Sequence, residues 1–394
     1  MSKIVFFCIP AYGHTNPTLE VVKALISKGN EVLYYSFNMM KEKIESTGGT
    51  FISCDKYNNI INLTNKDASR ISKDLGFSIK VIADTTLAMD KDICRELEMI
   101  KPDCIVADSM AFWGKMIAKK LNIPFVSSTT TFAFNRYSAK IMKKGFKELL
   151  AIAAALPEVN RQIKRLKKNG YNIKNIFDII GNDNNTDTIV YTSRMFQPFA
   201  ETFSDKYAFV GPSIRPISEP VQKIGDKLIY ISMGTVNNDM IEFYNSCIKA
   251  LKNTEYQVIM SVGNNIDIGT LGEIPENISV MPAVDQMAVL SVADVFISHC
   301  GMNSVNESLY FAVPLIMMPQ TSEQWGVCER VIQLGAGIRL EKTSSADIKA
   351  MVDKVLSDET FYKNAKLVSE DLKKCSGAEG AADKILEVCS NKGL

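Results

Sequence analysis

Residues 4–36 read IVFFCIPAYGHTNPTLEVVKALISKGNEVLYYS, and this stretch decides the fold class. Two short runs rich in β-branched and aromatic residues, 4–9 and 31–36, flank a segment at 17–27 in which apolar residues recur at helical spacing. An N-cap, a first-turn proline and a glycine past the end mark the bounds of that helix: Asn16, Pro17 and Gly29. A strand, a helix and a strand in this order predict a βαβ unit with parallel strands. The loop at 11–15 is then expected at the carboxyl end of the first strand.

The same rhythm continues in two blocks separated by a proline-rich stretch. Further strands are expected at 104–107, 124–127, 228–232, 257–262, 295–298 and 314–318. We therefore predict an α/β protein with two parallel-sheet domains, 1–212 and 226–376, a linker at 213–225 and a separate terminal helix at 377–394. Because open α/β sheets bind ligands beyond the carboxyl ends of their strands, we expect the functional residues in a cleft between the two domains.

Composition and charge narrow the function classes. A length of 394 residues corresponds to two or three domains at about 150 residues each. Lys and Arg number 45 against 44 Asp and Glu, so no net field attracts nucleic acid. The nine cysteines form no C-x-x-C pair, and no apolar run approaches the roughly 20 residues of a transmembrane helix. These features predict a soluble, cytoplasmic protein with reduced thiols.

The segment 136–174 is a local charge anomaly, with eleven Lys or Arg residues against two Glu. A solvated helical face is the ordinary interpretation of such a run. A surface for an anionic acceptor or for a membrane is the functional alternative, and the sequence leaves it open.

The chain has two histidines, His14 and His299, and each lies beside a glycine directly after an expected strand. A histidine at this edge of a sheet lies where catalytic groups gather, and near neutral pH it can accept a proton from a substrate hydroxyl. A carboxylate on the second ring nitrogen would fix its tautomer, and Asp108, at the end of the expected strand 104–107, is the candidate. Asp108 has an equal second interpretation, as the N-cap of a helix beginning at Ser109.

The strand before His299 runs into the sequence HCGMNS at 299–304 and then into a helix. Small residues at a helix N-terminus offer backbone amides and a positive dipole to an anion, which predicts a diphosphate site. A second glycine loop, with Gly234 and Thr235, could close over the same phosphates, although ordinary strand-to-helix turns are the alternative for these glycines. The chain has no P-loop and no G-x-S-x-G elbow, and its two histidines and scattered cysteines predict no metal site.

Three motifs, AYGHTNPTL at 11–19, ISHCGMNSVNE at 297–307 and PQTSEQ at 319–324, resemble family 1 nucleotide-sugar glycosyltransferases, in particular the bacterial macrolide-type enzymes. The resemblance implies a GT-B fold, in which two Rossmann-like domains face a cleft and the C-terminal helix crosses back to the first domain. It also implies an inverting, metal-independent transfer of a hexose from a UDP-sugar to a hydroxyl of a lipophilic or aromatic small molecule such as a macrolide, a flavonoid or another phenol. The UDP-sugar is a substrate, so no cofactor is expected.

The same resemblance assigns roles to individual residues. His14 would be the general base and Asp108 its orienting partner. The donor would be held by Gly234, Thr235, Gln286, His299, Gly301, Asn303, Ser304, Glu307, Glu323 and Gln324. Within this set the glycine loops, His299, Asn303 and Ser304 would meet the phosphates, Glu307 the ribose and Gln286 the base. Glu323 and Gln324 would bind sugar hydroxyls, and Gln at the latter position is associated with glucose.

Two parts of the pattern are less well defined. Family members commonly carry an aromatic platform for the base within W-x-P-Q, whereas this chain has Ala283 and Asp285 before Gln286, so the preference for UDP rests on the family default. On the acceptor side, strand position places four aromatic residues near the cleft, where each is either an acceptor contact or a core residue: Tyr12, Phe112, Trp113 and Phe132.

A UDP-dependent hexosyltransferase is therefore the predicted enzyme, with a UDP-sugar donor, a lipophilic acceptor and no nucleic-acid partner. A nucleotide-sugar epimerase or hydrolase on the same scaffold is one alternative, and a non-catalytic nucleotide-sugar binding protein is another. A monomer and a dimer both fit the sequence, and peripheral membrane contact stays open.

Overall fold

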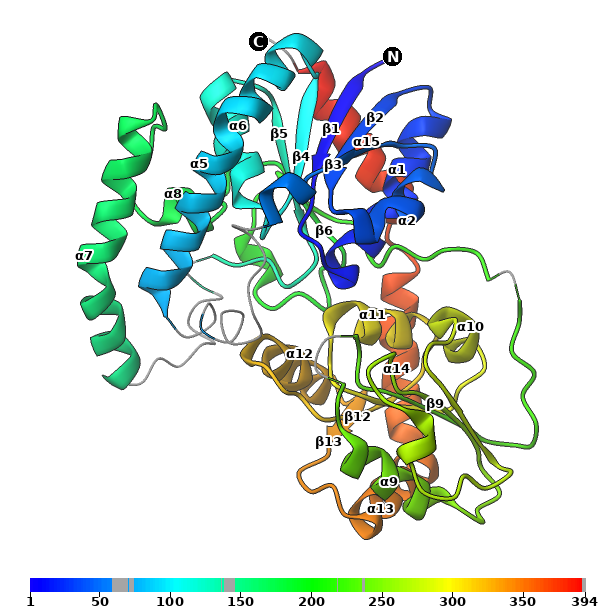
Figure 1. Ribbon diagram of the computed structural model, residues 1–394. Helices are drawn as coiled ribbons and strands as arrows, with labels where there is room; N and C mark the ends of the chain where they lie inside the picture. The colour runs from blue at the N-terminus through cyan, green and yellow to red at the C-terminus, as the bar shows by residue number, and fades with distance from the viewer. Residues whose placement is uncertain are drawn as a thin grey trace. The chain divides into compact units, whose positions relative to one another are not determined.

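The computed structural model describes residues 1–58, 70, 74–135, 137, 146–217, 219–235 and 238–391. The chain divides into two compact units. The first comprises Met1–Tyr191, Phe199–Ser213 and Ala378–Leu394, and the second comprises Thr192–Pro198 and Ile214–Gly377 (Figure 1). The short stretch Thr192–Pro198 thus groups with the second unit, although the sequence placed it in the first domain.

The first unit is built on a seven-stranded parallel sheet of order β3-β2-β1-β4-β5-β6-β7. Its strands are β1 Lys3–Phe7, β2 Glu31–Ser36, β3 Thr50–Ser53, β4 Cys104–Asp108, β5 Phe125–Thr129, β6 Thr188–Val190 and β7 Tyr207–Phe209. The α-helices are α1 Tyr12–Ser27, α2 Lys41–Glu45, α5 Leu75–Ile100, α6 Phe112–Leu121, α7 Phe146–Lys168, α8 Phe177–Ile180 and α15 Gly377–Ser390. Short 3-10 turns occupy Asn38–Met40, Asp55–Tyr57 and Ala200–Thr202.

Alternation along the central strand β1 divides the core of this unit into two layers. Ile4 and Phe6 pack with residues of α1 and α15, whereas Val5 and Phe7 pack with residues of α5 and α6 (Figure 1). Successive strand side chains point to opposite faces of a sheet, so a strand buried on both faces is apolar throughout. This explains the unbroken apolar run near the N-terminus.

Helix α1 begins earlier than the sequence predicted. Its first residue is Tyr12 and its N-cap is Ala11, so Pro17 lies inside the helix and Asn16 is not the N-cap. Proline lacks the N–H that bonds to the carbonyl four residues back, which normally ends or kinks a helix. Here the residues before the proline fold as one extra helical turn, with Thr15 N–H donating to the Ala11 carbonyl at 3.0 Å. The predicted loop at 11–15 is therefore the first turn of α1.

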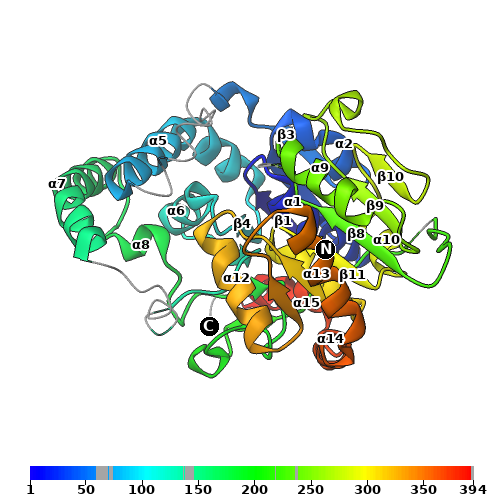
Figure 2. The same ribbon diagram turned by 90° about the horizontal axis from the view of Figure 1, so that it is seen from below.

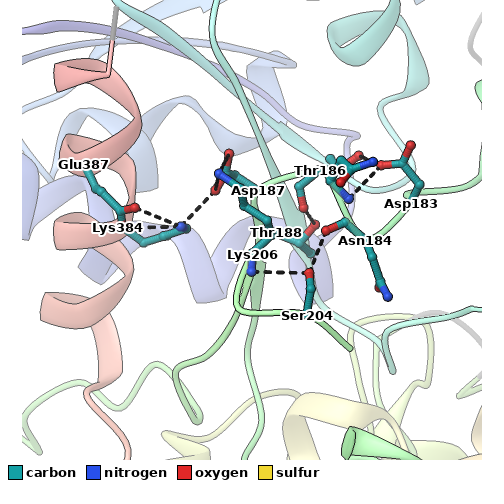
Figure 3. Close-up of polar contacts among 10 residues, drawn as sticks. Asp183, Asn184, Thr186, Asp187, Thr188, Ser204, Lys206, Lys384 and Glu387 are labelled. Carbon is teal, nitrogen blue, oxygen red and sulfur yellow. Dashed lines mark hydrogen bonds and ion pairs between the residues drawn. The ribbon is translucent and has the colours of Figure 1, made fainter. Parts of the chain in front are cut away.

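The C-terminal helix α15 belongs to the core of the first unit. Ala381, Ile385 and Val388 lie in the same apolar cluster as β1 and α1. Lys384 is buried on this helix, and its Nζ lies 2.8 Å from Asp187 Oδ1 and 3.3 Å from Glu387 Oε2 (Figure 3). Asp187 directly precedes β6, so this ion pair joins the last helix to the sheet.

We expect Lys384→Ala to destabilise the chain by about 1–3 kcal/mol, because it removes the nearer cation of a mostly buried ion pair and leaves Asp187 with only the longer contact to Lys206 Nζ, at 3.4 Å. Urea unfolding would measure this loss. Lys28→Ala is the matched control, since Lys28 pairs with Glu379 and Asp383, whose side chains are 65% and 66% exposed. Such exposed pairs contribute only about 0–1 kcal/mol. Equal losses in the two variants would contradict the prediction.

The second unit repeats the architecture with a six-stranded parallel sheet of order β10-β9-β8-β11-β12-β13. Its strands are β8 Leu228–Ser232, β9 Gln257–Ser261, β10 Ile278–Met281, β11 Val295–Ser298, β12 Leu315–Met317 and β13 Gly337–Arg339. Its helices are α9 Ile241–Leu251, α10 Gln286–Leu290, α11 Met302–Tyr310, α12 Ser322–Gln333, α13 Ser345–Ser357 and α14 Glu359–Leu372, with a 3-10 turn at Ile268–Thr270. Figure 2 shows β8, β9 and β10 side by side with α9 along them.

The central strand β8 separates two layers here as well. Ile229 and Ile231 pack in a cluster with residues of α9 and α13. Tyr230 points to the opposite face, where its ring stacks on Phe296 at 4.6 Å between centroids. The structure thus confirms the predicted α/β class with two parallel-sheet, Rossmann-like domains.

Part of the basic segment lies outside the described residues, namely Arg136 and 138–145. Most of its described part forms helix α7, on which Lys164, Lys167 and Lys168 are exposed. Within the described part of the chain, no helix is both long and apolar enough to span a membrane.

Candidate active site

His14 and Asp108 lie together at the carboxyl edge of the first sheet. His14 is in the first turn of α1, which follows β1, and Asp108 is the last residue of β4, the neighbour of β1. His14 Nδ1 is 2.7 Å from Asp108 Oδ2. The imidazole is 20% exposed, whereas the Asp108 side chain is 1% exposed, so the pair presents the histidine to solvent and buries the carboxylate.

The second carboxylate oxygen of Asp108 accepts a hydrogen bond from the turn that follows β4. Oδ1 accepts a hydrogen bond from Met110 N at 2.9 Å, and the Asp108 carbonyl accepts one from Ala111 N at 2.8 Å. Helix α6 begins only at Phe112, with Ala111 as its N-cap. The alternative that Asp108 caps a helix beginning at Ser109 is therefore wrong, because a turn separates the strand from the helix.

Thr130 is a third residue at this position, and it was not predicted from the sequence. Its Oγ1 lies 3.1 Å from His14 Nδ1, and the residue is 4% exposed. It directly follows β5, the strand beside β4. A run of five hydroxyl residues, SSTTT at 127–131, was the available signal, because it crosses the end of an expected strand.

Three buried titratable groups near the dyad, Cys8, Tyr34 and Tyr191, are neutral. Burial raises the pKa of the Cys8 thiol and that of the Tyr191 hydroxyl well above their ordinary values. Burial likewise raises the pKa of Tyr34, whose hydroxyl is hydrogen-bonded to Thr18 at 2.7 Å. These three groups therefore place no charge beside His14 and Asp108.

The four aromatic residues predicted for the acceptor differ in exposure. Trp113 and Phe132 are buried, at 5% and 8% exposure, and Trp113 packs in the core with Phe7. Tyr12 and Phe112 are partly exposed, and Lys43 Nζ lies 4.7 Å from the centre of the Tyr12 ring. Two exposed apolar side chains in the turns after β4 and β5 were not predicted: Met110 and Phe134.

In the second unit, His299 lies between two glycines. A Cβ at Gly234 would stand 2.6 Å from the imidazole, and one at Gly301 would stand 2.6 Å from its Nε2. Gly234 also has φ +80°, which L side chains rarely adopt. Any side chain at either glycine would thus displace the ring, so the structure brings together three predicted donor residues from two loops.

His299 is uncharged at neutral pH. Burial lowers its pKa to about 4, and a hydrogen bond with the Ser232 backbone opposes this shift only in part. Its Nδ1 is buried and has no hydrogen-bond partner within the described structure. A buried polar atom without a partner costs free energy, and Nδ1 of His299 is such an atom.

Helix α11 begins at Met302, directly after its N-cap Gly301, which has no side chain to accept a hydrogen bond from the first-turn amides. The first backbone amides of a helix have no partner within the helix and carry a partial positive charge. Asn303 and Ser304 lie in this first turn and are partly buried. Thr235, across from it in the second glycine loop, is exposed. This turn can therefore hold an anionic group.

Gln286 and Glu307 form a hydrogen-bonded pair. Gln286 Nε2 donates to Glu307 Oε2 at 2.5 Å and to Ser304 Oγ at 3.3 Å, and Tyr230 donates to Gln286 Oε1 at 3.4 Å. The predicted base-binding and ribose-binding residues are therefore adjacent. Burial raises the pKa of Glu307 to about 7, and the hydrogen bond from Gln286 opposes this shift.

Asp285, which replaces the expected proline, caps helix α10. Its Oδ1 accepts from Met287 N at 3.1 Å and Ala288 N at 3.2 Å. It also forms a two-pronged ion pair with Arg215, whose Nη1 lies 2.9 Å from Oδ2. The sequence did not single out Arg215, because nothing near it in the chain indicates this partner.

Glu323 and Gln324 lie in the first turn of helix α12 and differ in their hydrogen bonds and exposure. Gln324 Oε1 accepts from Gln320 N at 2.7 Å and Thr321 N at 3.2 Å, which completes a capping box with Thr321. Only the amino end of the amide is thus available for a sugar hydroxyl. Glu323 is exposed beside it. Among the described residues, no group of three or more His, Cys, Asp or Glu could hold a metal ion.

Glu307→Gln is expected to stabilise the ligand-free protein above pH 7. A carboxyl whose pKa is raised from 4.5 to about 7 binds more protons in the folded than in the unfolded state, so stability falls as pH rises between these values. The amide removes this loss and keeps an oxygen for Gln286. We expect Tm to rise by about 2–4 °C at pH 8 and little at pH 5.

Thermal unfolding at both pH values measures this effect, with Glu276→Gln as the control because Glu276 is exposed in a loop of the same unit. An equal change in Tm at pH 5 and pH 8, or a lower Tm for Glu307→Gln at pH 8, would contradict it.

Sequence comparison places the chain among nucleotide-sugar enzymes. The model of the family described as UDP-glucoronosyl and UDP-glucosyl transferase matches residues 211–374. The chain is 32% identical over 404 residues to the uncharacterized UDP-glucosyltransferase YojK of Bacillus subtilis, covering 100% of this chain and 98% of that protein. It is 33% identical over 398 residues to the NDP-glycosyltransferase YjiC of Bacillus licheniformis, covering 97% and 96% of the two chains.

Solved structures share the fold. The glycosyltransferase of kitacinnamycin superposes with a TM-score of 0.86 at 23% identity, covering 98% of each chain. The calicheamicin glycosyltransferase CalG4 superposes with a TM-score of 0.82 at 23% identity over the full length of both. These likenesses confirm the GT-B fold. With relatives above 30% identity along its whole length, the chain belongs to the UDP-glucoronosyl and UDP-glucosyl transferase family and is a UDP-dependent hexosyltransferase.

Proposed function

We propose that this enzyme transfers glucose from UDP-glucose to a hydroxyl of a lipophilic or aromatic small molecule, with inversion at the anomeric carbon. The observation that carries the proposal is the 2.7 Å contact between His14 Nδ1 and Asp108 Oδ2, which leaves the opposite nitrogen of an accessible imidazole as a base.

The proposed reaction is a single displacement. His14 Nε2 takes the proton of the acceptor O–H, and the acceptor oxygen forms a bond to C1 of the sugar. The bond between C1 and the phosphate oxygen breaks, and its electron pair leaves with UDP. The imidazolium is stabilised by the Asp108 carboxylate until it releases its proton to solvent.

In this proposal the second unit binds the donor. The first-turn amides of α11, with His299, Asn303 and Ser304, meet the diphosphate. Because His299 is uncharged at neutral pH, it acts as a hydrogen-bonding group and not as a cation. Glu307 takes the ribose hydroxyls, Gln286 lies beside it toward the base, and the amino end of Gln324 with Glu323 takes hydroxyls of the sugar.

We propose that the transfer needs neither a cofactor nor a divalent metal, since fixed amides and the helix dipole can stabilise the charge that develops on the leaving diphosphate. Full activity after treatment with EDTA would support this part, and activity restored only by a divalent cation would contradict it.

Exposed apolar side chains support a lipophilic acceptor. Met110 is 42% and Phe134 is 50% exposed in the turns that follow β4 and β5, the strands that supply Asp108 and precede Thr130. Relatives at lower identity are named demethyllactenocin mycarosyltransferase of Streptomyces fradiae, at 26%, and oleandomycin glycosyltransferase of Streptomyces antibioticus, at 25%. Since both names describe glycosyl transfer involving a small molecule, macrolides, flavonoids and simple phenols form the test panel.

The experiment measures UDP release from UDP-glucose with and without the acceptor panel, and mass spectrometry of the products. Release that depends on an acceptor and adds a hexose mass to it would support the proposal. UDP release or sugar epimerisation without an acceptor would contradict it. The anomeric configuration of the product, determined by NMR and compared with that of the donor, would test inversion.

A further inference from the structure

We propose that Thr130 is a positioning residue for the dyad: its hydroxyl shares the Nδ1 proton of His14 with Asp108 and thereby fixes the tautomer and raises the basicity of Nε2. This inference rests on the proposed function of His14 as the base. It concerns three side chains of the first unit, all of which the structure describes.

The position of the ring proton follows from what an ionised Asp108 can accept. An ionised carboxylate can only accept hydrogen bonds, so the 2.7 Å contact between Asp108 Oδ2 and His14 Nδ1 places the ring proton on Nδ1. Thr130 Oγ1, at 3.1 Å from the same nitrogen, then accepts the longer branch of a shared hydrogen bond. Nε2 consequently carries the lone pair that a general base requires.

The backbone fixes Thr130 as firmly as it fixes Asp108. The two preceding residues are bonded across the sheet, where Ser109 N donates to the Ser128 carbonyl at 2.8 Å and Tyr191 N donates to the Thr129 carbonyl at 3.3 Å. Thr130 itself is 4% exposed, so water does not readily replace its hydroxyl. A β-branched side chain also has few rotamers, which holds the oxygen in place.

Two acceptors on one nitrogen have a chemical consequence. When Nε2 takes a proton, the Nδ1–H becomes more acidic and both of its hydrogen bonds strengthen, so each acceptor stabilises the imidazolium. The Asp108 carboxylate contacts the ring, and the buried Cys8, Tyr34 and Tyr191 near this pair are neutral. Thr130 adds a neutral acceptor to this site without adding charge. Rotation of the ring would break both bonds, so the pair also holds the ring orientation.

The test compares Thr130→Val with Thr130→Ser and with Thr129→Val. Valine keeps the shape of the side chain and removes the oxygen, and serine restores the oxygen. Thr129→Val is the matched control, because it removes a hydroxyl from the neighbouring buried threonine, whose register partner is Val190. For Thr130→Val we expect kcat to fall about 3- to 10-fold with the KM for UDP-glucose unchanged. We also expect the acidic limb of the kcat/KM profile to move to lower pH, and Thr130→Ser to restore both.

A readout independent of activity uses the fact that the chain has only two histidines. With 15N-labelled histidine, NMR should show His14 protonated at Nδ1 in the wild type, and an added population of the other tautomer in Thr130→Val. If Thr130→Val has the rate, the pH profile and the tautomer of the wild type, the inference is overturned. It is also overturned if Thr130→Val loses rate with an unchanged pH profile and Thr129→Val loses rate as well. If the wild type transfers no sugar, or His14→Ala is fully active, the proposed function fails instead.

Discussion

Replacing His14 by alanine is expected to lower kcat by about 10²- to 10⁴-fold while the affinity for UDP-glucose stays the same. In the proposed mechanism the imidazole, which lies in the first unit with Asp108, acts on the acceptor proton, whereas the proposed donor residues belong to the second unit. Donor affinity measured by calorimetry and turnover measured by UDP release separate the two effects. Lys23→Ala is the control, because Lys23 is 47% exposed on the same helix.

The choice of acceptor provides a second test of the role of His14. A phenol that is already ionised at the assay pH needs no base, so His14→Ala should lose much less activity with it than with an aliphatic alcohol. A loss of the same size for both acceptors would mean that His14 binds or orients the acceptor and does not remove its proton. Unchanged turnover with every acceptor would exclude His14 from the mechanism.

The central strands of both sheets could be predicted from the sequence because each is buried on both faces. The predicted ranges 31–36, 228–232 and 295–298 coincide with β2, β8 and β11. Short strands at the edges were not predicted. β3 has four residues, of which the two at the ends are exposed and the two in the middle are partly buried, and β13 has only three residues, so neither carries enough apolar pattern to be distinguished from a loop.

The residues at which helices begin were less predictable than the strands. Pro17 normally marks the first turn of a helix, yet tertiary packing extends α1 back to Tyr12 and carries His14 into the helix. The proximity of His14 and Asp108 was still predictable, because each follows a strand and the two strands are neighbours. The contact with Thr130 was not, since it depends on the rotation of α1 above the sheet.

Local sequence rules would have described the proposed donor residues of the second unit more fully. Thr321 and Gln324 have the spacing of a capping box, so the sequence contained the signal that the Gln324 oxygen is occupied. Asp285 before a short apolar run is likewise an N-cap pattern. The pair of Gln286 with Glu307 was not visible, because the two residues come from different helices and meet only in the folded unit.

Asp108→Asn is the second change with a large expected effect, because it reverses the polarity of the contact at Nδ1. The asparagine keeps the shape of the side chain and an Oδ1 for Met110 N, so the turn before α6 can persist. Its amide group, however, can donate to Nδ1, which favours the tautomer with the proton on Nε2. That nitrogen is then a donor and no longer a base. We expect kcat to fall by about 10²- to 10⁴-fold with donor affinity unchanged.

The double variant His14→Ala/Asp108→Asn tests whether Asp108 acts through His14. If Asp108 acts only through the imidazole, the double variant should be no slower than His14→Ala alone, since groups that act as one unit are not additive. Asp92→Asn is the control for carboxylate removal, because Asp92 is 53% exposed on α5 of the same unit. Multiplicative losses in the double variant would show instead that Asp108 contributes independently of His14, for example by contacting the acceptor. Wild-type turnover in Asp108→Asn would mean that the buried carboxylate stabilises the turn before α6 and has no part in the reaction.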